Sequence, residues 1–473
     1  MDESVMSILQ MLQDGKISAQ EAENLIAALR GGATATATET SRPAPETATN
    51  ESTDKKKIDI KIDLDSLGER ISKAVARVQP ERIVKRMQNQ LRNATKAGAS
   101  WSSVMSAKVK AWAETGIERP ANTMGLPLHE ESHTQEFHLD DNAHVIVENP
   151  LGDVIVVGVE EGPASVSVRK AAWAATPEQA VSLAALMEVN IHGTDGRLDL
   201  KVSAPDPFQN GTVDLELKIP RSVAQARLKT TFGVLKASNI EGTLDVNSSS
   251  GTVTLSDIGS EVRVESASGS VSVENVRGVV SIASTSGDIH AANLDKGLRA
   301  GSASGDIHIS GLEGGSAECK SVSGDVLMEK AGLTNPLDIV LESISGDLVL
   351  TEAVGNLALK TISGDMQCSQ LMPTRLQAQT VSGDITLKLK DPYSSSLQVS
   401  TVSGDVNAMV PEGSNMRVSL STASGELRCE HDASEVTATD TLWCGNLGTG
   451  AGTMNVQTIS GDVHLLRAST GVE

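Results

Sequence analysis

The segment VSIASTSGDIHAANLDKGLRAGSASGDIHISGL, residues 280–312, contains two copies of one unit. In each copy the triplet Ser-Gly-Asp precedes an apolar residue, Ile289 or Ile307, and apolar residues alternate with other residues on both sides of the triplet. Alternation of this kind predicts two short strands that meet at a turn. Glycine suits such a turn because it adopts positive φ without a steric cost.

The unit recurs from residue 233 onward at intervals of 16 to 22 residues. The glycines that mark it are Gly233, Gly251, Gly269, Gly287, Gly305, Gly324, Gly346, Gly364, Gly383, Gly404, Gly425, Gly445 and Gly461. A period near 20 is typical of stacked repeats, in which neighbouring units bury one another's apolar sides. We therefore predict a mainly β protein, a parallel β-solenoid (β-helix) of about 13 coils that lie roughly 4.8 Å apart. A propeller or sandwich of antiparallel hairpins is the alternative, since two units match the length of one blade.

Aspartate follows the marker glycine in most units, at Asp288, Asp306, Asp325, Asp347, Asp365, Asp384, Asp405 and Asp462. We interpret this column as structural, because a short carboxylate can accept hydrogen bonds from backbone N–H groups at a turn. A serine or threonine three residues before the glycine is expected to bond, at the same corner, to the backbone or to its equivalent in the stacked coil. Calcium binding and catalysis by the column are the alternatives. A catalytic site needs one locally distinct cluster, which the same turn in every coil does not supply.

Composition divides the chain into five segments. Residues 1–30 predict a helical hairpin, and residues 31–54, rich in Thr, Ala, Glu and Pro, predict a disordered linker. Residues 55–119 predict a basic amphipathic helical segment. Residues 126–232 mix strands with one helix and are expected to cap the Ser-Gly-Asp solenoid of residues 233–473.

The two helical segments suggest partners. A hairpin the size of residues 1–30 is too small to be stable alone, so its apolar face is expected to pack on a protein partner or in a homo-oligomer. Residues 55–119 carry 15 lysines and arginines against 7 aspartates and glutamates, and include Trp101 and Trp112. Such a segment can lie on an anionic membrane surface or, as a further alternative, bind nucleic acid. Packing on the acidic solenoid or on a second copy is the simpler interpretation.

Charge argues against nucleic-acid binding. The formal net charge of the chain is −21, and from Gly233 onward 14 lysines and arginines face 29 aspartates and glutamates. An acidic rod repels phosphate backbones. Tyr393 and Trp443 are the aromatic residues of this region, which leaves little surface on which bases or sugars could stack.

Three motifs of the sequence resemble catalytic or binding sites. His129-Glu130-Glu131-Ser132-His133 matches H-E-x-x-H, but Pro127 precedes it and the residues after it alternate like a strand, so we interpret the match as coincidence. His290 and His308 occupy the same outward slot in neighbouring coils and are expected to be solvated rather than metal ligands. The run Gly448-Thr449-Gly450-Ala451-Gly452 lacks the lysine of a phosphate-binding loop. We expect no catalytic, cofactor-binding or metal-binding residues, and no cofactor.

The four cysteines show no C-x-x-C spacing. Cys319, Cys368 and Cys429 fall in core positions of the unit and are expected to be reduced and buried, whereas Cys444 replaces a turn serine and is the candidate for exposure. The opening MDESVMSILQ lacks the pattern of a signal peptide, and no stretch is apolar enough to span a membrane. The expectation is a cytoplasmic protein, with peripheral membrane contact as an open alternative.

The repeated strand-Ser-Gly-Asp-strand units, introduced by VDLELKIPRS and LKTTFGVLKASNIEG, resemble the "putative adhesin" family of bacterial β-strand-repeat proteins, a domain of unknown function. The opening ILQMLQDGKISAQEAENLIAAL resembles the short helical N-terminal domain of YvlB- and LiaX-type members. The resemblance implies a non-enzymatic binding or scaffold protein, linked in some relatives to the envelope-stress response and to sensing of membrane-active antimicrobials. It supplies no functional residues. A bactofilin-like filament former and a polysaccharide-active β-helix enzyme are the rival functions.

Overall fold

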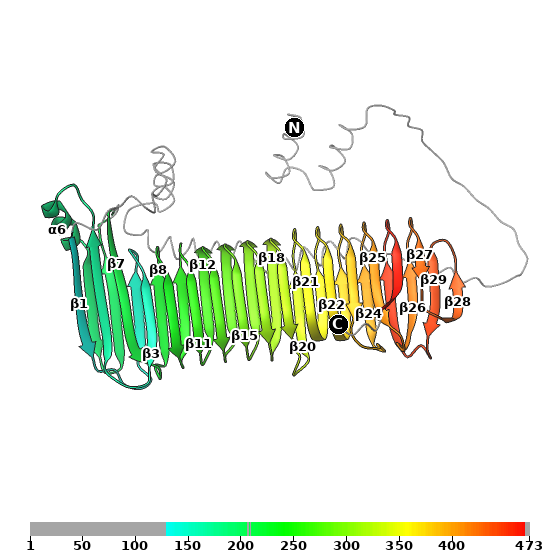
Figure 1. The fold of residues 1–473 in the computed structure, drawn as a ribbon, viewed down its shortest axis with the longest axis horizontal. Helices are drawn as coiled ribbons and strands as arrows, with labels where there is room; N and C mark the ends of the chain where they lie inside the picture. Colours follow the sequence, from blue (N-terminus) through cyan, green and yellow to red (C-terminus); the bar gives the residue numbers. More distant parts are fainter. Residues whose placement is uncertain (1–128, 206–207, 209, 469–473) are drawn as a thin grey trace, which may run out of the picture. The chain divides into compact units, whose positions relative to one another are not determined.

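The computed structural model describes residues 129–205, 208 and 210–468. These residues form 31 strands and one helix, α6 (Pro177–Ala185), and most strands run parallel in two stacked sheets (Figure 1). The helical hairpin expected at 1–30, the linker at 31–54 and the basic segment at 55–119 lie outside the described residues. The mainly β, mostly parallel class is confirmed.

Sheet A contains, in spatial order, β1 (His129–Phe137), β4 (Ala164–Ala172), β7 (Gly211–Pro220), β3 (Val154–Val159), β9 (Leu235–Ile240), β11 (Val253–Ile258), β13 (Val271–Val276), β15 (Ile289–Leu294), β17 (Ile307–Leu312), β19 (Val326–Ala331), β21 (Leu348–Lys360), β22 (Met366–Gln379), β23 (Ile385–Leu389), β25 (Val406–Pro411), β31 (Val463–Ala468) and β27 (Leu427–Cys429).

Sheet B contains β5 (Glu188–Thr194), β6 (Arg197–Ser203), β2 (His144–Asn149), β8 (Gln225–Thr230), β10 (Thr243–Ser248), β12 (Val262–Ser268), β14 (Val280–Ser286), β16 (Leu298–Ser304), β18 (Ser316–Ser323), β20 (Leu337–Glu342), the second halves of β21 and β22, β24 (Ser396–Ser400), β30 (Gly452–Gln457), β26 (Met416–Ser421), β29 (Leu442–Leu447) and β28 (Ser434–Ala438).

Each coil places one strand in sheet B and the next in sheet A. Val264 pairs with Ile282 in sheet B, and Val273 pairs with Ala291 in sheet A, both 18 residues further along and both in parallel register. Because neighbouring units pair in parallel rather than as hairpins, the propeller and sandwich alternative is wrong. Inward side chains of consecutive coils stack in columns that form one continuous apolar core.

The marker glycines hold the corner between the two sheets. A Cβ at Gly364 would overlap the carbonyl oxygen of Gly346 in the coil below, and the same overlap arises at Gly383 with Gly364. Gly364 and Gly383 also have positive φ, at 154° and 150°. The close stacking of successive turns therefore excludes a side chain at this position.

Buried hydroxyls line the inside of this corner. In five coils the hydroxyl oxygen donates to the carbonyl of the marker glycine below: Ser343 to Gly324, Thr361 to Gly346, Thr401 to Gly383, Thr458 to Gly404 and Thr422 to Gly461. The expectation of a hydroxyl bonded to the backbone is confirmed for these coils. Ser248, Ser266, Ser284, Ser302 and Ser321 are equally buried, and their hydroxyls have no such partner in the described structure.

A second corner, which the sequence did not reveal, lies six residues after each marker glycine from Gly233 to Gly364. The residue there adopts the left-handed conformation, with φ between 54° and 69°, at Asn239, Asp257, Asn275, Asn293, Gly311, Lys330, Glu352 and Gln370. Nδ2 of Asn275 donates to Oδ1 of Asp257 at 3.0 Å, and Nδ2 of Asn293 donates to Oδ1 of Asn275 at 3.0 Å. Asparagine, aspartate and glycine tolerate this conformation best, which explains their frequency in the first coils.

The stack extends upstream of Gly233. The coil β2–β3 lies between the coil β6–β7 on one side and the coil β8–β9 on the other, in parallel register with both. Beyond β7 and β6, the antiparallel strands β4, β1 and β5 close this end, and α6 packs on β4 and β1 (Figure 1). Thr176 caps α6 by accepting a hydrogen bond from the backbone N–H of Gln179 at 3.4 Å.

Candidate functional site

The H-E-x-x-H sequence lies on strand β1 and not on a helix. His129 and His133 therefore stand four residues apart on an extended strand, too far from each other to share a metal ion. Glu130 forms an ion pair with Arg169 at 2.7 Å, and Glu131 forms one with Lys170 at 3.0 Å. The two glutamates of the motif thus form ion pairs between β1 and the neighbouring strand β4.

His290 and His308 are register partners on β15 and β17, and their ring centroids lie 5.8 Å apart in an edge-to-face arrangement. No third ligand joins them: among the described residues, no group of three His, Cys, Asp or Glu side chains is placed to hold a metal ion.

The aspartate column forms a hydrogen-bond ladder between coils. Oδ1 of each aspartate accepts from the backbone N–H of the residue in the same slot of the next coil, for example Oδ1 of Asp347 from Asp365 at 2.8 Å. The ladder runs through Asp288, Asp306, Asp325, Asp347, Asp365, Asp384, Asp405, Asp462 and Glu426. One oxygen of each aspartate is therefore engaged in stacking.

Two of the cysteines are inert core residues. Cys319 and Cys368 are buried, and burial raises the pKa of the Cys368 thiol to about 12 and that of Cys319 further. Cys429 and Cys444 are half-buried. A buried thiol with a raised pKa is not a nucleophile at neutral pH.

The C-terminal end departs from the sequence order, and it is the most distinctive site of the described residues. Strand β30 lies between β24 and β26, and β31 lies between β25 and β27 (Figure 1, the red strand among orange ones). The coil β30–β31, residues 452–468, is thus inserted between the coils of residues 396–411 and 416–429.

Gly445 is not the turn of a coil, contrary to the sequence analysis. It lies inside β29, which pairs antiparallel with β26 and places Gly445 opposite Val418. The hairpin β28–β29 covers the end of sheet B, where the half-buried Trp443 packs against the core. Leu442 stands three residues before Gly445, where other units have Ser or Thr, because residues 442–447 form a strand and not the corner of a coil.

The glycine-rich run at residues 448–452 carries the chain around β26. Strand β29 lies on one side of β26 and β30 on the other, so residues 448–451 must cross the start of β26. Asn415 holds this crossing loop: its Oδ1 accepts from the Thr449 hydroxyl and from the backbone N–H of Ala451, both at 3.1 Å. Its carbonyl accepts from the N–H of Gly452 at 3.0 Å.

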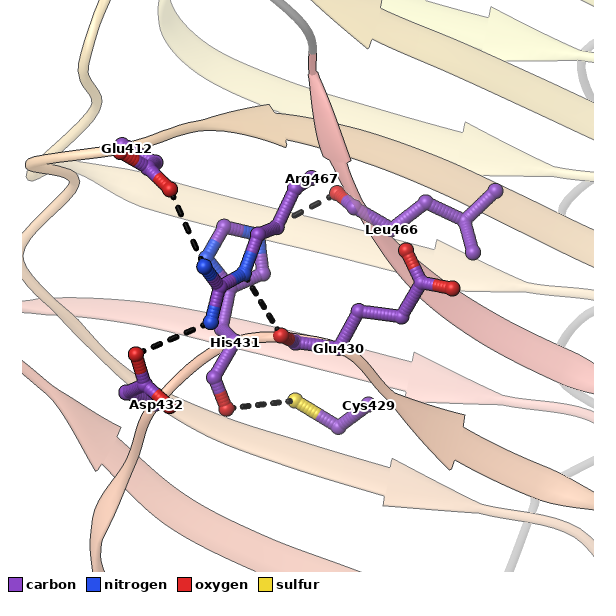
Figure 2. A network of polar contacts seen from close by, with 7 residues as sticks. All are labelled: Glu412, Cys429, Glu430, His431, Asp432, Leu466 and Arg467. Carbon is purple, nitrogen blue, oxygen red and sulfur yellow. Dashed lines mark hydrogen bonds and ion pairs between the residues drawn. The ribbon is translucent and has the colours of Figure 1, made fainter.

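Arg467, at the end of β31, fastens the inserted coil to both neighbours (Figure 2). Its guanidinium donates to Glu412 at 3.1 Å, on the loop after β25, and to Asp432 at 2.9 Å and the Glu430 carbonyl at 2.7 Å, on the loop after β27. His431 Nε2 lies 3.2 Å from the Leu466 carbonyl. These contacts join three segments that are distant in sequence.

This network is not a Cys–His catalytic pair. The Cys429 thiol donates to the carbonyl of His431 at 3.9 Å, while the imidazole points at Leu466 (Figure 2). Burial raises the pKa of the Cys429 thiol, although the contact with the His431 carbonyl opposes the shift. A thiolate, the reactive form, is therefore disfavoured.

An open hollow of about 540 Å³ lies beside α6, lined in part by Trp173, Leu183, Leu186 and Asn210. Glu178 is the ionisable residue of its lining, so the hollow offers no acid–base pair. The nine residues of α6 cannot cross a bilayer, and the described part of the chain contains no helix that could.

Comparison with known protein families gives two matches. The model of the Toastrack DUF4097 family matches residues 184–330, 295–396 and 343–466. The model of a SHOCT-like domain matches residues 3–33, the region for which a helical hairpin is predicted. No curated protein matches the chain.

Three of the solved structures that match this chain come from different bacteria. A "putative adhesin" from Bacteroides fragilis is 11% identical, with 72% of this chain and 100% of that chain covered and a TM-score of 0.24. A "putative lipid binding protein" from Parabacteroides distasonis is 12% identical, covers 72% and 97%, and has a TM-score of 0.23. A "putative cell adhesion protein" from Clostridium sporogenes is 8% identical, covers 72% and 100%, and has a TM-score of 0.18.

The family to which the chain belongs follows from the residues that the family model matches. The stacked strands that carry the Ser-Gly-Asp turns coincide with the three family matches, and these matches together span residues 184–466, more than half of the 473 residues. The chain belongs to the Toastrack DUF4097 family.

Proposed function

We propose that the chain is a non-enzymatic binding or scaffold protein, adhesin-like, which acts in a bacterial envelope-stress or antimicrobial-sensing system. The solenoid would be its rigid presenting surface, and residues 1–30 would be its protein-binding module. The match of residues 3–33 to a SHOCT-like domain supports a separate module at this position.

The aspartate ladder is the observation that carries the proposal. A carboxylate column would be the strongest candidate for chemistry in the solenoid, yet each of its members from Asp288 to Asp462 binds the backbone of the next coil. The same contact repeats in each coil of this ladder, so no position within it is set apart as a reaction centre. Repetition of one surface along a rigid stack favours recognition of an extended partner.

The rival functions make different demands. A polysaccharide-active enzyme needs a cleft with one irregular carboxylate cluster, whereas the hollow beside α6 has Glu178 as its carboxylate. A filament former needs open coil ends. The described stack instead carries β1, β4, β5 and α6 at one end and, at the other, the hairpin β28–β29 over sheet B. Both observations favour the binding protein.

We further propose that residues 55–119 contact an anionic membrane surface or pack on a second copy of the chain. The segment's excess of lysine and arginine supports both. Membrane contact predicts that the full chain binds vesicles with 30% phosphatidylglycerol and shifts its tryptophan fluorescence to the blue, and that deletion of residues 55–119 abolishes both. Binding should weaken at high salt. Unchanged binding after the deletion would refute it.

Affinity capture from a membrane-containing bacterial extract tests the main proposal. The full chain should retain a defined protein partner that the chain without residues 1–30 does not retain, while both chains unfold at the same temperature. Reducing-sugar release from acidic polysaccharides should stay at background for both. Retention of the same partner by both chains would refute the role of residues 1–30, and sugar release would refute the non-enzymatic function.

A further inference from the structure

The hollow beside α6 leaves apolar side chains uncovered. Its volume is about 540 Å³, and Trp173, Leu183 and Leu186 are the large apolar residues of its lining. Leu183 is partly buried against the core, whereas Leu186 is 48% exposed. On the same helix Ala180 and Ala184 are buried, so one face of α6 is anchored to the stack while Leu186 faces solvent. Such a surface is stabilised when other apolar side chains cover it.

The chain enters the described stack at the rim of this hollow. Strand β1 begins at His129, which is the register partner of Ala172 at the end of β4. Trp173, the residue after Ala172, lines the hollow, and α6 packs on both β1 and β4. Because β1 and β4 are antiparallel, a continuation of β1 toward lower residue numbers runs alongside Trp173 and the residues that follow it. The residues directly before His129 are therefore tethered at the rim.

The segment before His129 has the composition that the hollow requires. Residues 120–128, PANTMGLPL, carry no charged side chain, and three of the last five are apolar: Met124, Leu126 and Leu128. Strand β1 itself cannot cover the hollow, because its sequence HEESHTQEF presents exposed charged and polar side chains. Pro127 lacks the N–H that a continued ladder with β4 would need, which favours departure of the chain from the sheet. Leu126 lies within about 11 Å of His129 even in a fully extended chain.

We propose that the three apolar side chains of residues 124–128 dock in the hollow, against Leu183 and Leu186 of α6. The covalent tether gives these side chains a high effective concentration at the hollow, which a free partner lacks. The occupant is therefore this chain's own segment rather than a second copy or a foreign helix. The docked segment holds the carboxyl end of the basic segment, residues 55–119, close to α6. Docking needs neither a protein partner nor a membrane, so it is independent of the proposed function.

Paired cysteines in the full chain test the docking. All variants carry serine in place of the two half-buried cysteines, Cys429 and Cys444. Each of three chains combines Leu186→Cys with one cysteine in the segment: Met124→Cys, Leu126→Cys or Leu128→Cys. Oxidation at low protein concentration should give an intrachain disulfide in at least one of these chains, identified by peptide mass spectrometry.

Val181→Cys in place of Leu186→Cys is the matched control. Val181 lies on the same helix and is 50% exposed, but it does not line the hollow. The disulfide with position 186 should form at least about tenfold faster than the disulfide with position 181, because docking raises the local concentration of the segment in the hollow alone. Equal rates, or no disulfide with position 186, would overturn the proposal. A disulfide that forms between chains would assign the hollow to a second copy and overturn it as well.

Solvent access to the hollow gives a second test, which does not depend on disulfide geometry. In the same background, the thiol of Leu186→Cys is labelled with a maleimide in the folded full chain. Adding Leu126→Ser and Leu128→Ser should uncover the hollow and accelerate this labelling about tenfold, while Val181→Cys is labelled at an unchanged rate. Ile117→Ser, an equal loss of an apolar side chain outside the segment, is the control and should have no effect. Equally fast labelling of Leu186→Cys with and without the two serines would show that the segment does not cover the hollow.

Discussion

The backbone N–H of Asp462 donates to Oδ1 of Asp405, a residue 57 positions earlier, and not to an aspartate of the unit that precedes it in sequence. Glu426, which follows Asp405 by one repeat, donates instead to Asp462. This exchange of partners within one ladder shows that different coils of the solenoid can stack on one another through the same contacts. The order of the last coils follows from the crossing loop at residues 448–451, which places β30 on the far side of β26.

The ladder predicts that an aspartate can be replaced by asparagine but not by alanine. Oδ1 of Asp347 accepts from Asp365, and an asparagine Oδ1 can do the same. Asp347→Asn should therefore lower the free energy of unfolding by less than about 1 kcal/mol, and Asp347→Ala should lower it by about 1 to 3 kcal/mol because the Asp365 N–H loses its acceptor. Urea unfolding followed by circular dichroism measures both.

The core should matter more than the ladder. Leu341, fully buried, contacts the apolar core, and Leu341→Ala is expected to cost about 2 to 5 kcal/mol. An Asp347→Asn variant less stable than Leu341→Ala, or a large rise of the melting temperature with calcium, would mean that the ladder binds metal.

Glycine at the first corner should be irreplaceable. Gly364→Ala places a methyl group onto the Gly346 carbonyl and should cost more than about 2 kcal/mol. Gly196 has open space where its Cβ would lie, so Gly196→Ala is the matched control and should be near neutral. Equal effects of the two substitutions on the urea midpoint would contradict the stacking argument.

The second corner offers a stabilising change. Glu352 holds φ at 54°, a conformation that costs a glutamate more than an asparagine. Glu352→Asn should raise the free energy of unfolding by about 0.5 to 1 kcal/mol. Glu329→Asn is the control, since Glu329 lies on β19 with no positive φ, and asparagine is poor in strands. A loss of stability in Glu352→Asn would show that the corner does not select for left-handed residues.

Arg467 should control local opening of the inserted coil. Arg467→Gln removes the bonds to Glu412 and Asp432, so amide hydrogen exchange of β31 should accelerate while that of β13, in the middle of the stack, stays unchanged. Arg428→Gln, which loses an ion pair with the nearby Glu430, is the control and should leave β31 unaffected. Uniform acceleration in both strands would instead indicate global destabilisation.

The sequence by itself determined the repeat and its corner. The spacing of the marker glycines predicts parallel coils because an identical turn every 18 to 22 residues repeats the same inward columns, and Cys319 indeed stacks between Ala300 and Leu341 in that core. The steric and hydrogen-bonding requirements of the turn are encoded within each single unit, so the sequence alone is sufficient to predict the coil and its corner.

The order of the coils at the end was decided by tertiary structure alone. Gly445 keeps the spacing of a marker glycine yet lies in the antiparallel strand β29. Leu442, where other units have a hydroxyl, and Cys444, where they have the turn serine, were local signs of this. Because every coil satisfies the same register, the sequence could not indicate that Asp462 would stack on Asp405. That choice depends on the loop held by Asn415 and on Arg467, contacts between segments far apart in the chain.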